Sequence, residues 1–114
     1  MQEVRVAGFD PGGQKAFGWA VLTFSNGRMS QISTGTCSGS SQAVLAAKSM
    51  CPSPPLGVAV DAPLFWTAEG DRQADVVVRK LVCAAGGSSG TVSHVNSLRG
   101  ACLVQGVLVA RLAA

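Results

Sequence analysis

The stretch Val4-Arg5-Val6-Ala7-Gly8-Phe9-Asp10-Pro11-Gly12-Gly13 decides the fold. Residues 4–9 are apolar apart from Arg5 and include two β-branched valines, which is typical of a short buried strand. The Asp-Pro-Gly-Gly sequence that follows has the composition of a tight turn. The pattern therefore predicts a buried strand that ends on a carboxylate, Asp10.

The next residues predict that the chain turns back on this strand twice. Residues 17–24 form a second apolar run, and Ser25-Asn26-Gly27 carries the Asn-Gly signal of a two-residue hairpin. Residues 28–36 alternate weakly between apolar and polar side chains, which favours a third strand at or near the edge of a sheet.

Further elements follow with clear start and stop signals. Ser40 and Ser41 are candidate N-caps for a helix that runs through Met50 and is stopped by Pro52. Residues 56–60 predict a fourth strand, which ends in Asp61-Ala62-Pro63.

The remainder of the chain is expected to be mainly helical. A helix is expected from about residue 71 to residue 85, ended by Gly86-Gly87, with Val77, Leu81 and Ala84 facing a core. Residues 88–95 fit a loop or a short strand. A last helix is expected over residues 98–112, and a strand over residues 102–110 is the alternative.

This order of elements predicts an α/β fold with a mixed sheet and flanking helices. The first three strands form an antiparallel meander, and a right-handed crossover through the first helix makes the fourth strand parallel to the first. Neighbouring strands lie roughly 4.8 Å apart. Asp10 and Asp61 would then meet at the carboxyl ends of adjacent strands, where α/β sheets bind ligands.

The two aspartates predict a metal site. Two carboxylates on adjacent strands repel each other unless a cation neutralises them, and Mg²⁺ or Mn²⁺ prefers carboxylate oxygens plus water. Such ions activate water and stabilise the leaving oxygen of a phosphodiester. The alternative is that Asp10 and Asp61 only cap the turns that follow them.

Several motifs now carry a family resemblance. VAGFDPG at residues 6–12, followed by GWAV at residues 18–21, resembles the first motif of RuvC-type Holliday junction resolvases and their RNase H-like relatives. With VAVDAPL at residues 58–64, RQADVVVRKL at residues 72–81 and NSLRGA at residues 96–101, the set resembles the domain-of-unknown-function family four-two-nine, predicted nucleases of RNase H-like fold.

The resemblance implies roles for individual residues. Asp10 and Asp61 take the places of metal-binding, catalytic acids, and Asp75 joins them as a third candidate catalytic residue. The family pattern R-x-x-D-x-x-x-R falls on Arg72, Asp75 and Arg79, which share one helix face. Arg72 and Arg79 are then candidate substrate-binding residues in a polar wall of the site. The alternative is a solvated face with an Asp75–Arg79 ion pair.

Two further residues are candidates because of their position and type. Lys15 lies in the loop after Asp10 and can contact a phosphate, although a solvated loop lysine is the alternative. His94 is the single histidine, and it is a candidate general base or ligand without a partner motif.

The sequence departs from the family at its end. RNase H-like nucleases continue into a fifth strand and a helix that supply a last acidic or histidine ligand, whereas no acidic residue follows Asp75 here. We therefore expect a domain that is incomplete at the C-terminus, takes its last ligand from elsewhere, or has lost catalysis. An exposed fourth strand beside an apolar last helix predicts that the chain either forms a homo-oligomer through these two elements or is poorly stable alone.

Composition narrows the class of protein. The 114 residues suffice for one domain, residues 1–114, and a net charge of +3 permits a nucleic-acid partner without requiring one. Four cysteines without C-x-x-C spacing argue against a zinc knuckle, and the N-terminus does not resemble a signal peptide, so a cytoplasmic location is expected. No apolar run is long enough for a membrane span.

Three functions remain as hypotheses. The first is a metal-dependent nuclease that uses Mg²⁺ or Mn²⁺ on phosphodiester bonds of nucleic acid. The second is a nucleotide-binding domain of the actin-like ATPase type, which also places an aspartate-glycine turn after its first strand. The third is a non-catalytic interaction module that keeps the RNase H-like fold.

Overall fold

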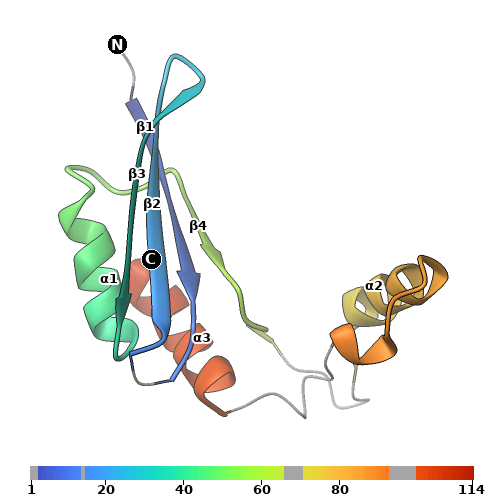
Figure 1. Ribbon diagram of the computed structural model, residues 1–114. Helices are drawn as coiled ribbons and strands as arrows, with labels where there is room; N and C mark the ends of the chain where they lie inside the picture. Colours follow the sequence, from blue (N-terminus) through green and yellow to red (C-terminus); the bar gives the residue numbers. More distant parts are fainter. Residues whose placement is uncertain (1–2, 14, 66–70, 93–99) are drawn as a thin grey trace. The chain divides into compact units, whose positions relative to one another are not determined.

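The computed structural model describes residues 3–13, 15–65, 71–92 and 100–114 (Figure 1). The chain forms two compact units, one made of residues 1–64 with 100–114 and the other of residues 65–99. The expectation of a single domain over residues 1–114 stays a prediction.

A mixed four-stranded sheet organises the first unit. Its strands are β1 (Glu3–Asp10), β2 (Phe17–Ser25), β3 (Arg28–Cys37) and β4 (Gly57–Val60), in the spatial order β3-β2-β1-β4. β1 pairs antiparallel with β2, β2 pairs antiparallel with β3, and β4 pairs parallel with β1. This confirms the predicted meander with a parallel fourth strand, and it confirms that β3 lies at an edge.

The hairpin between β2 and β3 has the expected turn. Asn26 and Gly27 both have positive φ angles, 53° and 74°, and Ser25 pairs with Arg28 across them. Positive φ at both central residues is the requirement of a type I′ turn, whose twist matches that of the paired strands. The local sequence therefore suffices to place this turn.

Two helices cover one face of the sheet. α1 (Ser40–Ser49) and α3 (Gly100–Ala113) contact each other, and they pack on the face that carries alternate residues of β1 and β2. The buried core lies between them and consists mainly of small or medium side chains: Ala7, Phe9, Phe17, Val21, Ala43, Val44, Ala47 and Val109. Small residues on α1 allow the helix to approach the sheet closely.

The start of α1 differs from the sequence-based prediction. Gly39, rather than Ser40 or Ser41, is the N-cap residue, and its backbone is extended. The Ser40 N–H instead donates a 3.0 Å hydrogen bond to Oε1 of Gln105 on α3. Gln105, which belongs to a distant helix, thus satisfies one of the backbone donors that the first turn of α1 leaves without an intrahelical partner.

The second unit contains α2 (Gln73–Ala84) and the 3₁₀ turn η1 (Ser89–Thr91). Gly86 has φ of 84°, its N–H bonds to the Cys83 carbonyl, and the Gly87 N–H bonds to the Val82 carbonyl. These are the two bonds of a Schellman motif, so the Gly-Gly stop signal is confirmed. Within residues 88–92 the expected loop or short strand is this 3₁₀ turn.

The faces of α2 are the reverse of those predicted. Val77 and Leu81 are 45 % and 65 % exposed and Ala84 is also exposed, whereas Asp75 is 8 % exposed. The prediction placed the apolar stripe against a core and the polar stripe in solvent. Among the described residues of this unit, Asp75 is buried and Arg72 and Arg79 are half-buried, and all three form ion pairs.

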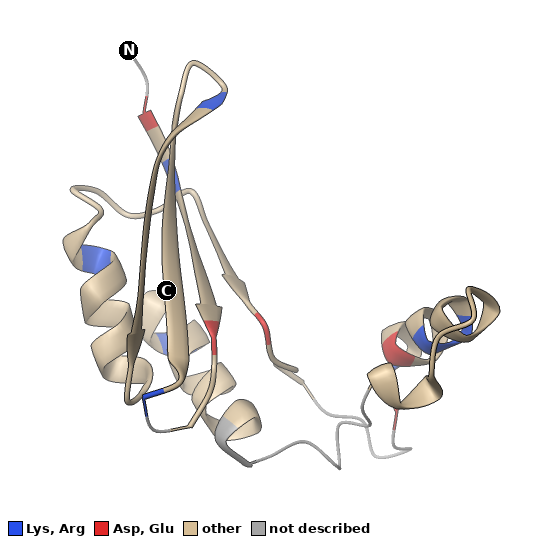
Figure 2. Cartoon of the chain, viewed as in Figure 1, with Lys and Arg blue, Asp and Glu red and all other residues tan. Residues whose placement is uncertain are grey.

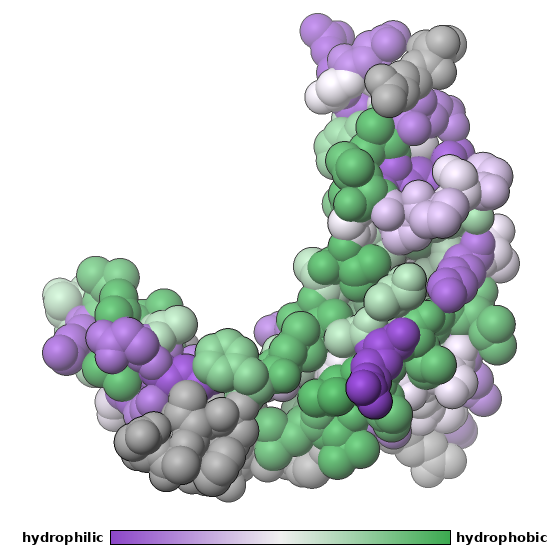
Figure 3. Space-filling view, turned by 180° about the vertical axis from the view of Figure 1, so that it is seen from behind, coloured by the Kyte–Doolittle hydropathy of each residue, from purple (hydrophilic) through white to green (hydrophobic). Residues whose placement is uncertain are grey.

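The last helix is confirmed over its described part, because α3 rather than a strand occupies residues 100–113. Its outer residues Val104, Val107, Leu108 and Leu112 are exposed, as are Leu56 and Val58 near β4. Hydrophobic side chains are visible at the surface of this unit (Figure 3). Self-association through β4 and α3 stays a prediction.

Among the described residues no helix has the length and hydrophobicity needed to cross a bilayer.

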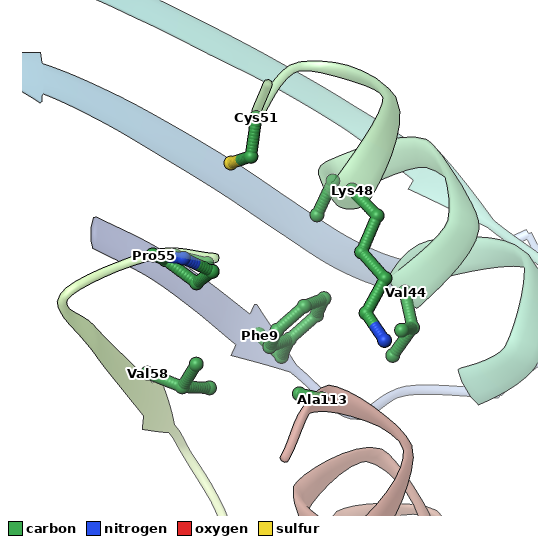
Figure 4. A pocket seen from close by; sticks show the side chains of 9 residues that line it. Phe9, Val44, Lys48, Cys51, Pro55, Val58 and Ala113 are labelled. Carbon is green, nitrogen blue, oxygen red and sulfur yellow. The ribbon is translucent and has the colours of Figure 1, made fainter. Parts of the chain in front are cut away.

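A small gap remains in the core between the sheet and the two helices (Figure 4). Its volume is about 20 Å³, and Phe9, Val44, Val58 and Ala113 lie around it. Such a volume holds about one water molecule, and an apolar lining gives that water few partners. The gap is therefore an imperfection of packing and has no room for a ligand.

We expect Val109→Ala to destabilise the protein by about 1–3 kcal/mol, because Val109 is fully buried and its truncation leaves a cavity. Val104→Ala on the same helix is the matched control and should change stability by less than about 0.5 kcal/mol, since Val104 is 61 % exposed. Urea denaturation measures both values. Equal losses in the two variants would contradict the packing of α3 described above.

Candidate carboxylate site

The ends of β1 and β4 bring two carboxylates to the same edge of the sheet. Asp10 is the last residue of β1, and Asp61 directly follows β4. Phe9 pairs with Val60, so the next step in register places Asp10 beside Asp61. The Asp61 N–H donates a 2.8 Å hydrogen bond to the Phe9 carbonyl, which continues the ladder to this point. Figure 2 shows the two acidic positions at neighbouring strand ends.

This arrangement confirms that the two aspartates end adjacent parallel strands. Both residues are exposed, and within the described ranges neither carboxylate has a hydrogen-bond or ion-pair partner. Two unpaired like charges at the ends of adjacent strands repel each other. A cation between them would relieve that repulsion.

The carboxylates border an open depression on the sheet face opposite α1 and α3. Side chains alternate across a strand, so Asp10 lies on the face opposite the buried Phe9. The depression has a volume of about 370 Å³. It is lined by Asp10 and Asp61 together with Gly8, Phe9, Gly18, Trp19, Ala20 and Ala59. Half of these residues are glycine or alanine, so the surface next to the carboxylates is low and accessible.

Glycine is needed at one point beside this depression, the turn after Asp10. Gly18 lies opposite Asp10 across the β1–β2 ladder, where a Cβ would stand 3.5 Å from the Asp10 Cβ, which is ordinary contact. A Cβ on Gly12 would collide with the Ala16 carbonyl oxygen, so only glycine fits the turn after Asp10. Sequence reasoning singled out the aspartates but missed Gly8, Gly18, Ala20 and Ala59 as a floor; their small size at alternate strand positions was the available signal.

Lys15 lies in the loop between β1 and β2. Its φ angle is 61° and its side chain is exposed. The loop closes through a 3.0 Å hydrogen bond from the Ala16 N–H to the Gly13 carbonyl. Lys15 is thus a solvent-facing cation within five residues of Asp10 in the sequence, and its contact with a phosphate stays a prediction.

The polar residues of α2 form two ion pairs in the second unit. Arg72 binds Asp75 with two hydrogen bonds of 2.7 Å. Arg79 binds Asp71 at 2.6 Å and donates two hydrogen bonds to the Val92 carbonyl, which ties α2 to the end of η1. The Arg72 guanidinium also lies 5.2 Å from the centre of the Phe65 ring.

The observed pairing corrects the predicted Asp75–Arg79 pair. Arg72 precedes the helix with extended backbone angles, which lets its side chain fold back onto the first turn. There the guanidinium forms a bidentate pair with the carboxylate of Asp75, with one hydrogen bond to each oxygen. Arg79 is drawn instead to Asp71 and Val92, groups that only the folded segment brings near. Spacing within a helix could not identify these competitors.

The Arg72–Asp75 pair changes the acidity of both groups. Hydrogen bonds from Arg72 lower the pKa of the Asp75 carboxyl, and the bond to Asp75 raises the pKa of the Arg72 guanidinium. Burial opposes both shifts, because it disfavours the charged forms. Asp75 is therefore an ionised structural anchor of α2 at neutral pH. Its catalytic role, and the substrate-binding roles of Arg72 and Arg79, stay predictions.

Comparison with known families adds one finding. The family described as "Protein of unknown function (DUF429)" matches residues 8–101, which is most of the chain. The chain belongs to this family. No curated protein and no solved structure matches it.

The DUF429 match contains every candidate site residue, from Asp10 to His94. The description of the family assigns no activity. His94 lies outside the described residues. The structure thus brings Asp10 and Asp61 together in the first unit and Arg72, Asp75 and Arg79 together in the second.

The donor set fits a hard divalent cation. No group of three or more histidine, cysteine or acidic residues gathers within the described part of the chain. Two carboxylates nevertheless suit Mg²⁺, which commonly binds through one or two carboxylates and retains several water molecules. Asp10 and Asp61 are the residues that would hold such an ion.

We expect the helix population of α2 to fall as the pH drops below about 4. The folded pKa of Asp75 is lowered, so its contribution to stability is present above the unfolded pKa and is lost as the pH falls through the folded pKa. Cα chemical shifts of α2, recorded from pH 7 to about pH 2, measure the change.

Asp75→Asn should lower the helix population of α2 at neutral pH and weaken its response to acid. Glu3→Gln is the control and should keep the wild-type response, because the Glu3–Arg5 pair lies in the first unit. Identical acid profiles for wild type and Asp75→Asn would show that this ion pair does not support α2.

Proposed function

We propose that this chain is a metal-dependent phosphodiester hydrolase domain of RNase H-like architecture, acting on nucleic acid. The observation that carries the proposal is the placement of Asp10 and Asp61, whose unpaired carboxylates end adjacent parallel strands beside an open depression. The strand order β3-β2-β1-β4, with its single parallel pair, is compatible with that architecture.

The chain's own residues would act chiefly by placing charge. Asp10 and Asp61 hold negative charge at one point, and the ladder bond between Asp61 and Phe9 fixes their strands side by side. When bound there, Mg²⁺ or Mn²⁺ supplies Lewis acidity for activating a water molecule and for stabilising negative charge on a phosphoryl group.

The shape of the depression supports a polymeric substrate. Gly8, Gly18, Ala20 and Ala59 present little more than backbone to solvent next to the carboxylates. A phosphodiester backbone is wide and charged, and it needs a low surface that lets its phosphate approach the metal-binding oxygens. Lys15 adds an exposed positive charge in the loop after β1, and such charges attract phosphates at long range.

A non-catalytic module of the same architecture is the second candidate. It is favoured by the finding that only two acidic side chains, Asp10 and Asp61, meet in the described part of the first unit. Such a module would keep the cation and nucleic-acid binding without efficient hydrolysis. Measurements of metal binding and of cleavage separate the two candidates.

We expect Mn²⁺ or Mg²⁺ to raise the melting temperature of the wild type, because a ligand bound only by the native state stabilises it, by about 2.7 kcal/mol at a concentration of 100 times Kd. Asp10→Asn and Asp61→Asn should each abolish most of this shift. Glu3→Gln, which removes a carboxylate near the opposite end of β1, is the matched control and should retain it. Equal shifts in all four proteins would remove the support for the site.

We expect the purified chain to cleave single- or double-stranded nucleic acid only when Mn²⁺ or Mg²⁺ is present. The rate should fall by about 100-fold or more in Asp10→Asn and Asp61→Asn, since each loses a metal-binding charge. Gel assays with labelled DNA and RNA, with EDTA as a blank, measure it. Metal binding by the wild type without Asp10-dependent cleavage would favour the non-catalytic module.

A further inference from the structure

One stripe of α3 faces the rest of the first unit and contacts it at several levels. Val109 is fully buried in the core, and Gln105 accepts the hydrogen bond from Ser40 at the start of α1. One turn earlier, the Cys102 thiol donates a 3.4 Å hydrogen bond to the Pro11 carbonyl. The described part of α3 thus packs on the core at one end and on the turn after Asp10 at the other.

Gly106 lies on this stripe, at a point where α3 passes close to Ala62. It is buried, and a Cβ added to it would stand 2.6 Å from the Ala62 Cβ. The same Cβ would lie 3.9 Å from Pro11 Cγ and from Leu64 Cδ2, which is ordinary contact. Pro11 directly follows Asp10, and Ala62 directly follows Asp61. One residue of α3 therefore lies beside the turns that leave both acidic strand ends.

The choice of glycine at this position opposes the local preference of the helix. Glycine is among the least favourable residues in a helix interior, whereas alanine is the most favourable. The space beside Gly106 explains the exception, because an alanine there would force Ala62 or the helix to move. The Asp61 N–H to Phe9 carbonyl bond lies one residue from Ala62, so a displacement of this turn acts on it first.

We propose that Gly106 is a positioning residue for the candidate carboxylate site. Its missing side chain lets α3 rest against both turns at once, and this contact holds Asp61 at its spacing from Asp10. Cys102 assists by holding the Pro11 turn from the same helix. The inference rests on the proposed function for its metal-binding consequence, but its structural core is the contact between α3 and the two turns.

The first test adds a methyl group at position 106 and then removes one at position 62. Gly106→Ala should speed exchange of the Asp61 amide by about tenfold or more, because the added methyl group would displace Ala62 and weaken the hydrogen bond from the Asp61 N–H to the Phe9 carbonyl. Adding Ala62→Gly should restore the wild-type rate, since the double variant keeps the same number of methyl groups at the contact. The Leu56 amide, which bonds to the Arg5 carbonyl at the other end of β4, is the internal control and should change less than about twofold.

The second test measures Mn²⁺ affinity in the same proteins. Gly106→Ala should raise the Kd by about tenfold, and the double variant should recover the wild-type value. Gly57→Ala is the matched control on β4, because a Cβ there meets no atom within 4 Å, and it should bind as the wild type does. Recovery in the double variant is a result that a general loss of stability would not give.

The outcomes distinguish the inference from the proposed function. A wild type that binds no Mn²⁺ overturns the proposed metal site, and amide exchange at Asp61 then decides the positioning role alone. Wild-type exchange in Gly106→Ala overturns the positioning role, whatever metal does. If the Gly106→Ala variant fails to fold, the double variant decides the question. A double variant that folds without restoring protection of the Asp61 amide also overturns the positioning role.

Discussion

The parallel pairing of β1 with β4 is the interaction on which the rest of the first unit depends. It requires the chain to cross over the sheet through α1, and this crossover is what brings residues near position 60 beside residues near position 9. The hydrogen bonds between β1 and β4 continue one residue beyond the end of β4, where the Asp61 N–H donates to the Phe9 carbonyl. The pairing thereby forces two carboxylates together at an edge where no described side chain neutralises them.

Small residues make this arrangement sterically feasible on both sides of the sheet. On one face, alanines of α1 and Gly106 of α3 let the two helices approach the strands and turns closely. On the other face, Gly8, Gly18 and Ala20 leave a low surface next to the carboxylates. Glycine and alanine therefore serve both faces of the sheet: they allow close packing of the helices on one face and leave the carboxylates accessible on the other.

The second unit is held together by a different kind of force. Among the described residues of α2, Asp75 is the buried one, and Val77 and Leu81 are exposed. Among the described residues of this unit, arginine–carboxylate pairs and the bonds from Arg79 to the Val92 carbonyl join α2 to its neighbouring segments. Ion pairs in partly buried positions depend on close geometry, because the cost of removing charges from water must be offset by good hydrogen bonds.

The sequence by itself determined the features that rest on neighbouring residues. The apolar run before Asp10, the Asn26-Gly27 hairpin and the Gly86 helix stop are local patterns, and each appears where it was predicted. The adjacency of Asp10 and Asp61 also followed, because the handedness of the crossover and the alternation of strands and helix leave little freedom in strand order.

Only the tertiary structure decided the features that depend on residues far apart in the chain. The Gln105 bond at the start of α1, the partner of Arg79 and the contact of Gly106 with Ala62 each join segments that no local pattern relates. Their energies come from close packing and directional hydrogen bonds, which fall away within fractions of an ångström. Sequence periodicity reports which face of an element is apolar, but only the folded chain sets which atom lies opposite which.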